Sequence, residues 1–364
     1  MRVVVKIGTS SLTDADGAID VQAVAKASAE IAGLRSRGID VVVVSSGAVA
    51  SGLPALGWDA DERPRDARTL QAVSAIGQAL LVQTWNECLG AHGLIAGQVL
   101  LAPLDFMVRG QYLQARGTLD RLLELGVVPV VNENDAVADD ELRFGDNDRI
   151  AALVAQLLGA DLLILLTDAP GLMDADPRFA SDASLIEEIV EIDHELESLA
   201  GGAGTDRGSG GMASKLAAAK MASWSGVRAV IAAATRPDVL ADAVDGAVGV
   251  GTVVVPRDRR LPARKLWIAF ALPAEGQVVV DPGAVAAITS GGRSLLAAGV
   301  VEVRGAFAAE DAVEICDPDG TVVAKGLCRV GAATLRTMAG RRSADLSEGA
   351  GEVVHRDDLV VLPR

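Results

Sequence analysis

The chain has 364 residues, half of them hydrophobic and only 3% aromatic, which is long enough for two domains and a substantial core. Its formal net charge of −16 disfavours general attraction to nucleic acid or to anionic membranes. The three cysteines are odd in number and far apart, which argues against a disulfide framework and is typical of a reducing compartment.

The first two-thirds of the chain alternates strand and helix patterns. Residues 3–7 form a β-branched run with no signal peptide before it. No later apolar run reaches membrane-spanning length, so we expect a soluble, cytoplasmic protein without a membrane partner. A helix with Asp20 as N-cap is predicted at residues 21–37, and four valines at 41–44 predict a buried strand.

Further helices are predicted near residues 67–89 and 111–125, and further strands at 127–131, 162–166 and 227–232. The regular alternation of strand and helix, with a core of Ala, Val, Leu and Ile, is typical of a sheet covered by helices on both faces. The sequence therefore predicts an α/β domain, a layered sandwich with a mostly parallel central sheet.

Polar or glycine-rich segments follow four of the predicted strands, at residues 6–11, 45–48, 132–135 and 167–171. The carboxyl ends of parallel strands meet at one edge of a sheet, where ligands bind in open α/β folds. One such segment would be an ordinary turn, but four at the same edge predict a binding site.

Two lysine-bearing segments indicate phosphoryl transfer. Residues 208–215 form a glycine-rich loop that leads into an apolar helix with Lys215 in its first turn, so backbone N–H groups can approach a bulky anion. The spacing is not that of a Walker loop, and a plain flexible loop before a surface helix is the alternative. Lys6 at the end of the first strand supplies a second cation, unless it only extends into solvent. The pair predicts phosphoryl transfer. With ATP as the donor, the two lysines and Mg²⁺ would stabilise the γ-phosphoryl group from two sides.

The sequence also indicates what accepts the phosphoryl group. No histidine is placed to act as a base, and the three histidines show no metal-ligand spacing, so we expect no metal-ligating residues in the protein. A carboxylate acceptor is already ionised at neutral pH and needs no base, which favours an acyl-phosphate product. The segment at 145–148 opens an amphipathic helix, where its carboxylates and amides either cap the helix or bind an ammonium group and hold the lysines.

The C-terminal part has a different pattern. Residues 259–274 have a linker composition and separate a domain at 1–258 from a small, mostly β domain at 275–355. Short β runs lie at 278–280, 300–303, 313–315 and 321–324, and the Asp-Pro-Asp-Gly sequence at 317–320 predicts a hairpin turn.

Six segments, in this order, resemble the amino-acid kinase family. They are VKIGTS at 5–10, VSSGA at 44–48, PVVNEND at 129–135, GDND at 145–148, LTD at 166–168 and SGGMASK at 209–215. The NEND and GDND pair is the specific part of the resemblance, whereas the lysine and glycine loops are shared across the wider family. Residues 276–342 are similar to a PUA domain, so the resemblance covers nearly the whole chain.

The resemblance implies ATP-dependent phosphorylation of the side-chain carboxylate of L-glutamate to L-glutamyl 5-phosphate, the first step of proline biosynthesis. By resemblance, Lys6 and Lys215 contact the ATP phosphates and the transferring group, and Asp148 orients both lysines. Ser46, Asp135 and Asn147 would hold glutamate. The nucleotide would be lined by Thr167, Asp168, Ser209, Gly210, Gly211, Met212, Ala213, Ser214 and Lys215. Ser45 and Ser209 stand where threonine is common, and Ala169-Pro170 after the Thr-Asp pair is less usual.

Two alternative functions stay open at this point. The first is a sister kinase of the same family that acts on aspartate, acetylglutamate or carbamate. The second is RNA binding through the PUA-like domain. Residues 275–364 carry nine Lys and Arg against 13 Asp and Glu, with Phe307 as their one aromatic residue, which disfavours RNA binding.

The resemblance also implies several partners. Proline, the end product of the pathway, is expected to inhibit at the glutamate site. A homo-oligomer, either a dimer or a tetramer, is expected through the kinase domain. The labile acyl phosphate is suited to hand-over to a glutamyl-phosphate reductase.

Overall fold

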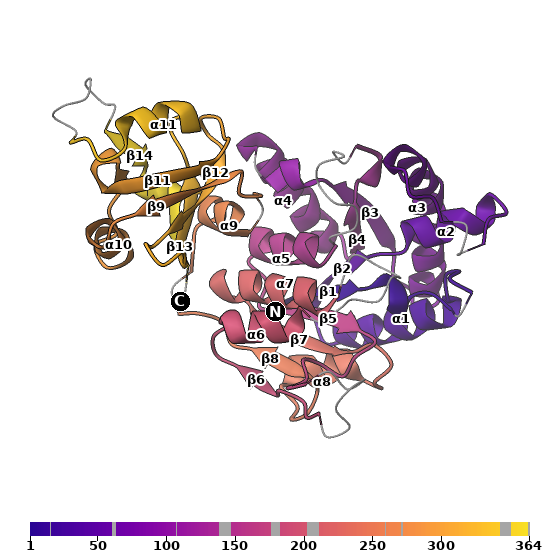
Figure 1. Cartoon of the computed structure of the whole chain (residues 1–364). Helices are drawn as coiled ribbons and strands as arrows, with labels where there is room; N and C mark the ends of the chain where they lie inside the picture. The colour runs from indigo at the N-terminus through magenta and orange to yellow at the C-terminus, as the bar shows by residue number, and fades with distance from the viewer. Residues whose placement is uncertain are drawn as a thin grey trace. The chain divides into compact units, whose positions relative to one another are not determined.

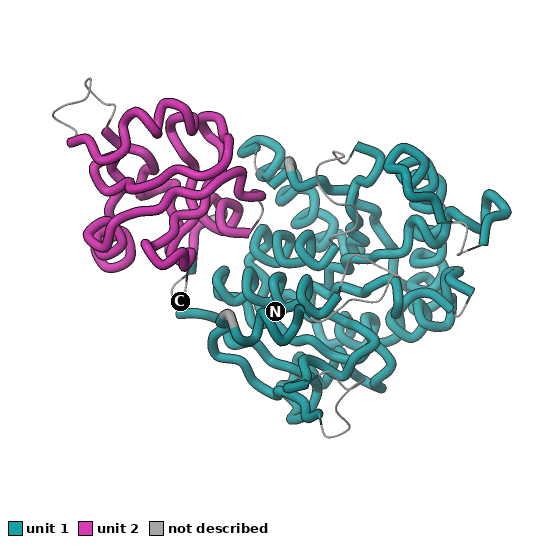
Figure 2. The backbone as a smooth tube through the Cα atoms, in the orientation of Figure 1, with its two compact units in different colours: residues 1–260 teal, residues 261–364 magenta. Residues whose placement is uncertain are grey.

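The computed structural model describes residues 1–14, 16–59, 63–106, 108–137, 147–175, 183–201, 211–258, 260–270, 272–342 and 351–362. The chain forms two compact units, Met1–Arg260 and Leu261–Arg364 (Figure 2). Within the described ranges, no helix combines the length and the apolar character needed to cross a membrane.

The first unit is built on an eight-stranded sheet with the order β3-β4-β2-β1-β5-β7-β8-β6 (Figure 1). The strands are β1 (Arg2–Ile7), β2 (Asp40–Ser45), β3 (Ala96–Leu101), β4 (Val128–Glu133), β5 (Leu162–Thr167), β6 (Glu188–Ile189), β7 (Arg228–Ala233) and β8 (Thr252–Val254). Neighbouring strands in this order run parallel, except for β7 and β8, which are antiparallel. The prediction of a layered α/β domain with a mostly parallel sheet is confirmed.

Helices cover both faces of this sheet. They are α1 (Val21–Ser36), α2 (Ala48–Ala55), α3 (Ala67–Gly90), α4 (Arg109–Glu124), α5 (Asn147–Leu158), α6 (His194–Ala200), α7 (Met212–Trp224) and α8 (Val239–Asp245). Val3, Val5 and Ile7 of β1 point to the face where α1, α3 and α8 pack. Because side chains alternate along a strand, Lys6 points to the opposite face, where α5 and α7 pack against each other.

Two glycines bring α2 and α3 into direct backbone contact. A Cβ atom added at Gly77 of α3 would lie 1.7 Å from the carbonyl oxygen of Ala48, and one at Gly52 of α2 would lie 2.1 Å from that of Val73. No side chain fits in either place. The contact fixes α3 against the segment that follows β2.

We expect Gly77→Ala to lower the free energy of unfolding by about 3 kcal/mol, because the two helices must separate to admit one methyl group. Urea denaturation measures this loss. Gly90→Ala at the end of the same helix is the control, since a Cβ there meets nothing within 4 Å and alanine favours a helix by about 1 kcal/mol. Equal stability of the two variants would contradict the close approach.

The second unit is mostly β. Its five-stranded sheet has the order β11-β9-β12-β13-β15, and β10 pairs with β14. The strands are β9 (Gly276–Val280), β10 (Leu295–Leu296), β11 (Val300–Gly305), β12 (Ala312–Cys316), β13 (Val322–Leu327), β14 (Glu352–Val354) and β15 (Leu359–Val361), and the helices are α9 (Ala263–Phe270), α10 (Pro282–Thr289) and α11 (Ala332–Met338). The hairpin turn between β12 and β13 is confirmed, since Asp317 Oδ1 accepts hydrogen bonds from the backbone N–H groups of Asp319 and Thr321.

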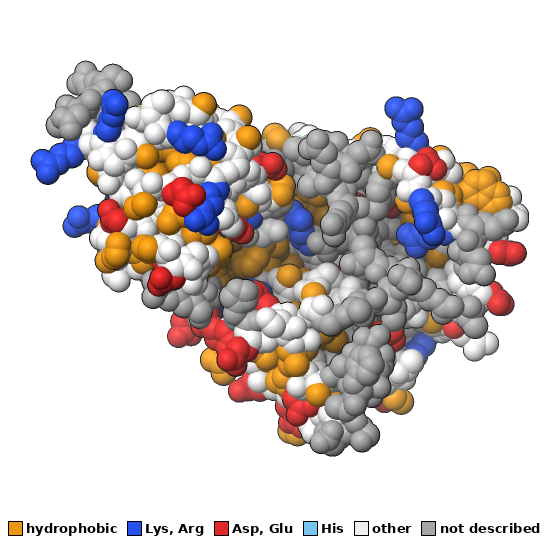
Figure 3. Space-filling model, in the orientation of Figure 1, with side chains coloured by type: hydrophobic (Ala, Val, Ile, Leu, Met, Phe, Trp, Pro, Cys, Tyr) orange, Lys and Arg blue, Asp and Glu red, His pale blue; other side chains and the backbone are white. Residues whose placement is uncertain are grey.

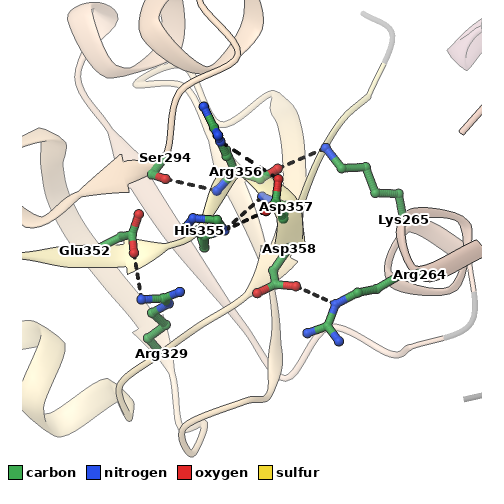
Figure 4. Close-up of polar contacts among 9 residues, drawn as sticks. All are labelled: Arg264, Lys265, Ser294, Arg329, Glu352, His355, Arg356, Asp357 and Asp358. Carbon is green, nitrogen blue, oxygen red and sulfur yellow. Dashed lines mark hydrogen bonds and ion pairs between the residues drawn. The ribbon is translucent and has the colours of Figure 1, made fainter. Parts of the chain in front are cut away.

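The structure differs from the predicted linker at residues 259–274. Helix α9 lies within that segment and packs against β13 and β15 of the second unit. Arg264 Nε lies 2.5 Å from Asp358 Oδ1, and Lys265 Nζ donates to the carbonyl oxygen of Arg356 at 2.9 Å (Figure 4). These contacts make α9 part of the second unit. Strand β15 also lies beyond the predicted domain end at residue 355.

Charges of both signs are mixed on the surface of the second unit. On the face seen in Figure 3, its Lys and Arg side chains are interspersed with Asp, Glu and apolar side chains. Arg304 pairs with Glu302, and Arg329 pairs with Glu352, both at 2.7 Å. On this face, the described residues of the second unit therefore form no continuous basic patch of the kind that nucleic-acid binding generally uses.

Candidate active site

A buried carboxylate lies between two buried lysines on the α5 and α7 side of the sheet. Lys6 Nζ of β1 is 2.6 Å from Asp148 Oδ1, and Lys215 Nζ of α7 is 3.4 Å from Asp148 Oδ2. The exposed fractions of the three residues are 3% for Lys6, 1% for Asp148 and 4% for Lys215. We refer to these three residues as the lysine cluster. The alternative interpretations, in which Lys6 extends into solvent and Lys215 lies on the surface of its helix, are therefore wrong.

Local structure explains why these residues meet. Lys6 is directed to this face by the alternation of β1. Asp148 is in the first turn of α5, where a helix favours a negative charge, and Lys215 is in the first turn of α7. Since α5 contacts both β1 and α7, three distant segments converge on one point.

The charges of the lysine cluster depend on one another. Burial raises the pKa of Asp148, but the positive charges of Lys6 and Lys215 outweigh it and hold this pKa below its ordinary value. Burial lowers the pKa of Lys215, and the Asp148 carboxylate only partly offsets this. Two ammonium groups and one carboxylate leave one positive charge in a site almost free of solvent, which favours an anionic ligand.

Ser214 supports Asp148 from the same turn of α7 as Lys215. Its Oγ lies 2.6 Å from Asp148 Oδ2 and 2.8 Å from the carbonyl oxygen of Gly211. The predicted nucleotide residues Gly211, Met212 and Ala213 begin α7 beside it. Ser209 and Gly210 lie outside the described residues, so their predicted role is not tested by the structure.

The predicted nucleotide residues Thr167 and Asp168 lie at the end of β5, the direct neighbour of β1. Thr167 is buried and its Oγ1 donates to Asp168 Oδ1 at 3.0 Å. Gly8 follows β1 at the same edge, where an added Cβ would come within 3.4 Å of Lys6 Nζ. The absence of a side chain at Gly8 leaves space beside the Lys6 ammonium group.

The predicted glutamate residues lie on the other side of β1. Ser46 follows β2, and its backbone N–H donates to the carbonyl oxygen of Ile7 at 3.1 Å. Asp135 follows β4, and the Asn147 side chain reaches β4 by accepting from the backbone N–H of Glu133 at 3.2 Å. Because Asn147 precedes Asp148, it links the end of β4 to the lysine cluster.

The order of strands at this edge therefore separates the predicted binding residues into two groups. The residues after β4 and β2 lie on one side, those after β5 lie on the other, and Lys6 of β1 lies between them. Among the described residues, no group of three or more His, Cys, Asp and Glu side chains is arranged to hold a metal ion.

Sequence reasoning did not find two buried polar residues of α3. Ser74 Oγ donates to Asp135 Oδ2 at 2.5 Å, and Gln78 Nε2 donates to the carbonyl oxygen of Glu133 at 3.2 Å. Burial raises the pKa of Asp135, whereas the Ser74 hydrogen bond and the charge of Arg63 act in the opposite direction. The only signal in the sequence is that two polar residues stand one helical turn apart.

Comparison with known proteins agrees with this arrangement. Residues 1–233 match the amino acid kinase family and residues 276–349 match the PUA domain. Over 366 aligned positions the chain is 44% identical to a protein of Burkholderia multivorans named glutamate 5-kinase, with 99% of this chain and 98% of the relative covered. A protein of the same name from Ralstonia nicotianae is 45% identical, with 99% and 97% covered.

A solved structure has the same fold at low sequence identity. The carbamate kinase from Giardia lamblia bound to AMP-PNP is 19% identical and superposes with a TM-score of 0.50, covering 70% of this chain and 98% of that chain. The family match covers residues 1–233, and the relatives named glutamate 5-kinase align over 99% of the chain. The chain belongs to the amino acid kinase family.

Proposed function

We propose that the protein transfers the γ-phosphoryl group of ATP to the side-chain carboxylate of L-glutamate, giving ADP and L-glutamyl 5-phosphate. This reaction would be the first step of proline biosynthesis. The relatives named glutamate 5-kinase align along nearly the whole chain. The observation that carries the proposal is the buried Asp148 between Lys6 and Lys215, because it presents two cations at the edge where the four polar loops meet.

The lysine cluster suits this chemistry. Both substrates are anions, so they repel each other, and negative charge spreads over the phosphoryl oxygens in the transition state. In the proposed mechanism Lys6 and Lys215 contact these oxygens from two sides, and Asp148 fixes the two ammonium groups in place. The glutamate carboxylate, with an ordinary pKa of about 4.3, attacks without a general base.

We propose that Mg²⁺ enters this site as a partner of the nucleotide. Both oxygens of Asp148 are engaged by lysines, so this carboxylate is not available as a ligand. Mg²⁺ commonly keeps several waters and binds substrate phosphates. When bound with ATP, the ion would neutralise part of the phosphate charge, while Thr167, Asp168 and the residues that begin α7 line the nucleotide.

We assign glutamate to the other side of β1, near Ser46, Asp135 and Asn147. The Asp135 carboxylate is suited to the α-ammonium group of the substrate, because a charge-assisted hydrogen bond is strong in a buried site. The residues at the end of β4 then place the side-chain carboxylate of glutamate toward the lysine cluster.

Asp135→Asn should raise the KM for glutamate about 10- to 100-fold, since a hydrogen bond to a charged group contributes about 1.5–3 kcal/mol. The KM for ATP should stay nearly constant, because the nucleotide residues lie across β1. Steady-state kinetics with each substrate varied in turn measures both values. Asp20→Asn, a change at the N-cap of α1 where asparagine caps equally well, is the control. An unchanged KM for glutamate would remove Asp135 from the substrate site.

The proposed reaction is tested with purified protein, Mg-ATP and hydroxylamine, which traps acyl phosphates as hydroxamates. Glutamate, aspartate, acetylglutamate, carbamate and no acceptor are compared, with ADP release measured in parallel as a second readout of turnover. Hydroxamate with glutamate alone supports the proposal. Product from a different acceptor would leave the proposed phosphoryl transfer standing but show that glutamate is not the substrate. The absence of product with every acceptor would show that the proposed reaction is wrong.

The place of the reaction in proline synthesis leads to a proposal about regulation. We expect millimolar proline to inhibit at subsaturating glutamate and saturating glutamate to relieve the inhibition, because proline would occupy or distort the site at residues 132–147. Initial rates at several proline concentrations test this. A rate that does not respond to proline would contradict it.

Three further assignments follow from the same proposal. The protein is expected to form a dimer or tetramer through its kinase unit, which light scattering after gel filtration measures. It is expected in the cytoplasm. Its labile product is suited to direct hand-over to a glutamyl-phosphate reductase.

A further inference from the structure

Helix α3 presents two buried polar side chains to the segment that follows β4. Gln78 holds this segment twice, since its Nε2 donates to the carbonyl oxygen of Glu133 at 3.2 Å and its Oε1 accepts from Asn132 Nδ2 at 3.3 Å. One turn earlier, Ser74 Oγ donates to Asp135 Oδ2 at 2.5 Å. The helix thus fixes both the backbone of the segment and the carboxylate that ends it.

The direction of the Ser74 hydroxyl is unusual for a serine or threonine inside a helix. Such hydroxyls commonly bond to the carbonyl oxygen four residues earlier. Thr84 of the same helix does so with Leu80, and Thr289 of α10 does so with Val285. Ser74 is 1% exposed, and its hydroxyl instead contacts a carboxylate 61 residues away in sequence.

Alanine would serve better at this position if only packing mattered. Serine is a weaker helix former, and a buried hydroxyl costs free energy unless it has a partner. The position lies on a tightly packed part of α3, next to Val73 and three residues before Gly77, both of which lie against α2. Packing alone therefore does not explain a serine at position 74.

We propose that Ser74 is a positioning residue for the amino-acid substrate: its hydroxyl fixes one oxygen of the Asp135 carboxylate and so directs the other toward the α-ammonium group. The inference rests on the proposed function, in which Asp135 contacts that ammonium group. Ser74 itself does not touch the substrate. It acts through Asp135.

The electrostatics around Asp135 give this role a signature in the pH profile. The carboxylate is faced by Ser74 from α3 and influenced by Arg63 from the segment before α3, and Glu133 precedes it on β4. Burial already raises the pKa of Asp135, and the Ser74 hydrogen bond lowers it. Loss of the hydroxyl therefore raises this pKa further. Because only the ionised carboxylate binds an ammonium group, activity at low glutamate should fall off at a higher pH.

Ser74→Ala tests the inference in the full-length protein. We expect the KM for glutamate to rise about 10-fold, because Asp135 loses the charge-assisted hydrogen bond that orients its carboxylate toward the ammonium group. The kcat and the KM for ATP should stay within about two-fold, because the lysine cluster is untouched. The acid limb of kcat/KM for glutamate should move to higher pH.

Ser223→Ala is the matched control. Its hydroxyl is also buried and donates to the carbonyl oxygen of Val255 at 2.6 Å, but Val255 follows β8, five strands away from β4. Thermal unfolding of both variants measures the purely structural cost. The inference is overturned if Ser74→Ala leaves the glutamate KM and the pH profile unchanged, or if it raises the KM for both substrates equally.

The hydroxamate assay of the wild-type protein, measured alongside the two variants, distinguishes failure of this inference from failure of the proposed function. If the wild type forms no hydroxamate with any amino acid, the proposed function fails, and the inference fails with it. If the wild type is active with glutamate and Ser74→Ala behaves like Ser223→Ala, the role of Ser74 alone is wrong.

Discussion

Lys215→Ala should lower kcat by about 10³-fold or more, the scale found when a positioned cation is removed from a phosphoryl-transfer site. Lys215 is 4% exposed, and its ammonium group is held against Asp148, so it is a positioned cation rather than a mobile surface charge. The expected loss is in the chemical step, because negative charge develops on the phosphoryl oxygens only in the transition state. A coupled ADP-release assay at saturating glutamate and ATP measures it.

Lys220→Ala is the control for this result. Lys220 lies five residues further along α7 and pairs with the exposed Glu197 instead of a residue of the lysine cluster. It should keep kcat within about two-fold, since its ammonium group has no contact with the lysine cluster. Full turnover by Lys215→Ala would remove this lysine from the reaction and with it the central argument for phosphoryl transfer.

Asp148→Asn should cost both stability and activity. The change keeps the shape of the side chain but removes the charge that compensates two buried ammonium groups. Breaking a buried pair in this way typically lowers the free energy of unfolding by about 3–5 kcal/mol. Urea denaturation at pH 7 measures the loss, and the ADP-release assay measures the accompanying fall in kcat.

The pH dependence of this stability difference has a definite sign. The pKa of Asp148 in the folded protein lies below its ordinary value, so its contribution is present at neutral pH and is lost as the pH falls through the folded pKa. The difference in the free energy of unfolding between the wild type and Asp148→Asn should therefore become smaller as the pH falls. Asp245→Asn is the control, because Asp245 pairs with Arg37 on the exposed surface, where solvent screens the pair, and its loss should change the stability little. Equal losses from Asp148→Asn and Asp245→Asn would show that burial does not strengthen the Asp148 contacts.

The sequence allows the central strands and the lysines to be predicted for clear physical reasons. The strands β1, β2 and β5 are continuous apolar runs, as strands buried on both faces are. Lys6 is predictable because it stands near the end of the first strand. Lys215 is predictable because it stands in the first helical turn after a glycine-rich loop. The position of Asp148 between them was implied by resemblance, and the structure brings the three together.

Other features could not be predicted because they depend on contacts rather than on local pattern. Strand β3 begins with Ala96, Gly97 and Gln98, which break the apolar run of an edge strand. Helix α9 has only eight residues and is held by contacts with β13 and β15 of the second unit, to which it belongs. Ser74 and Gln78 can be assigned to one face of a helix from their spacing, but nothing in the sequence says that this face meets residues 132–135.

The order of strands at the carboxyl edge of the sheet has a kinetic consequence. From β4, which precedes Asp135, to β5, which ends at Thr167, there are three inter-strand steps, or about 14 Å at ordinary strand spacing. With the proposed assignment, glutamate and the nucleotide would occupy their halves of the site at the same time without competing for side chains. The geometry suits a ternary complex in which the phosphoryl group passes directly from donor to acceptor over β1, with no phosphorylated enzyme in between.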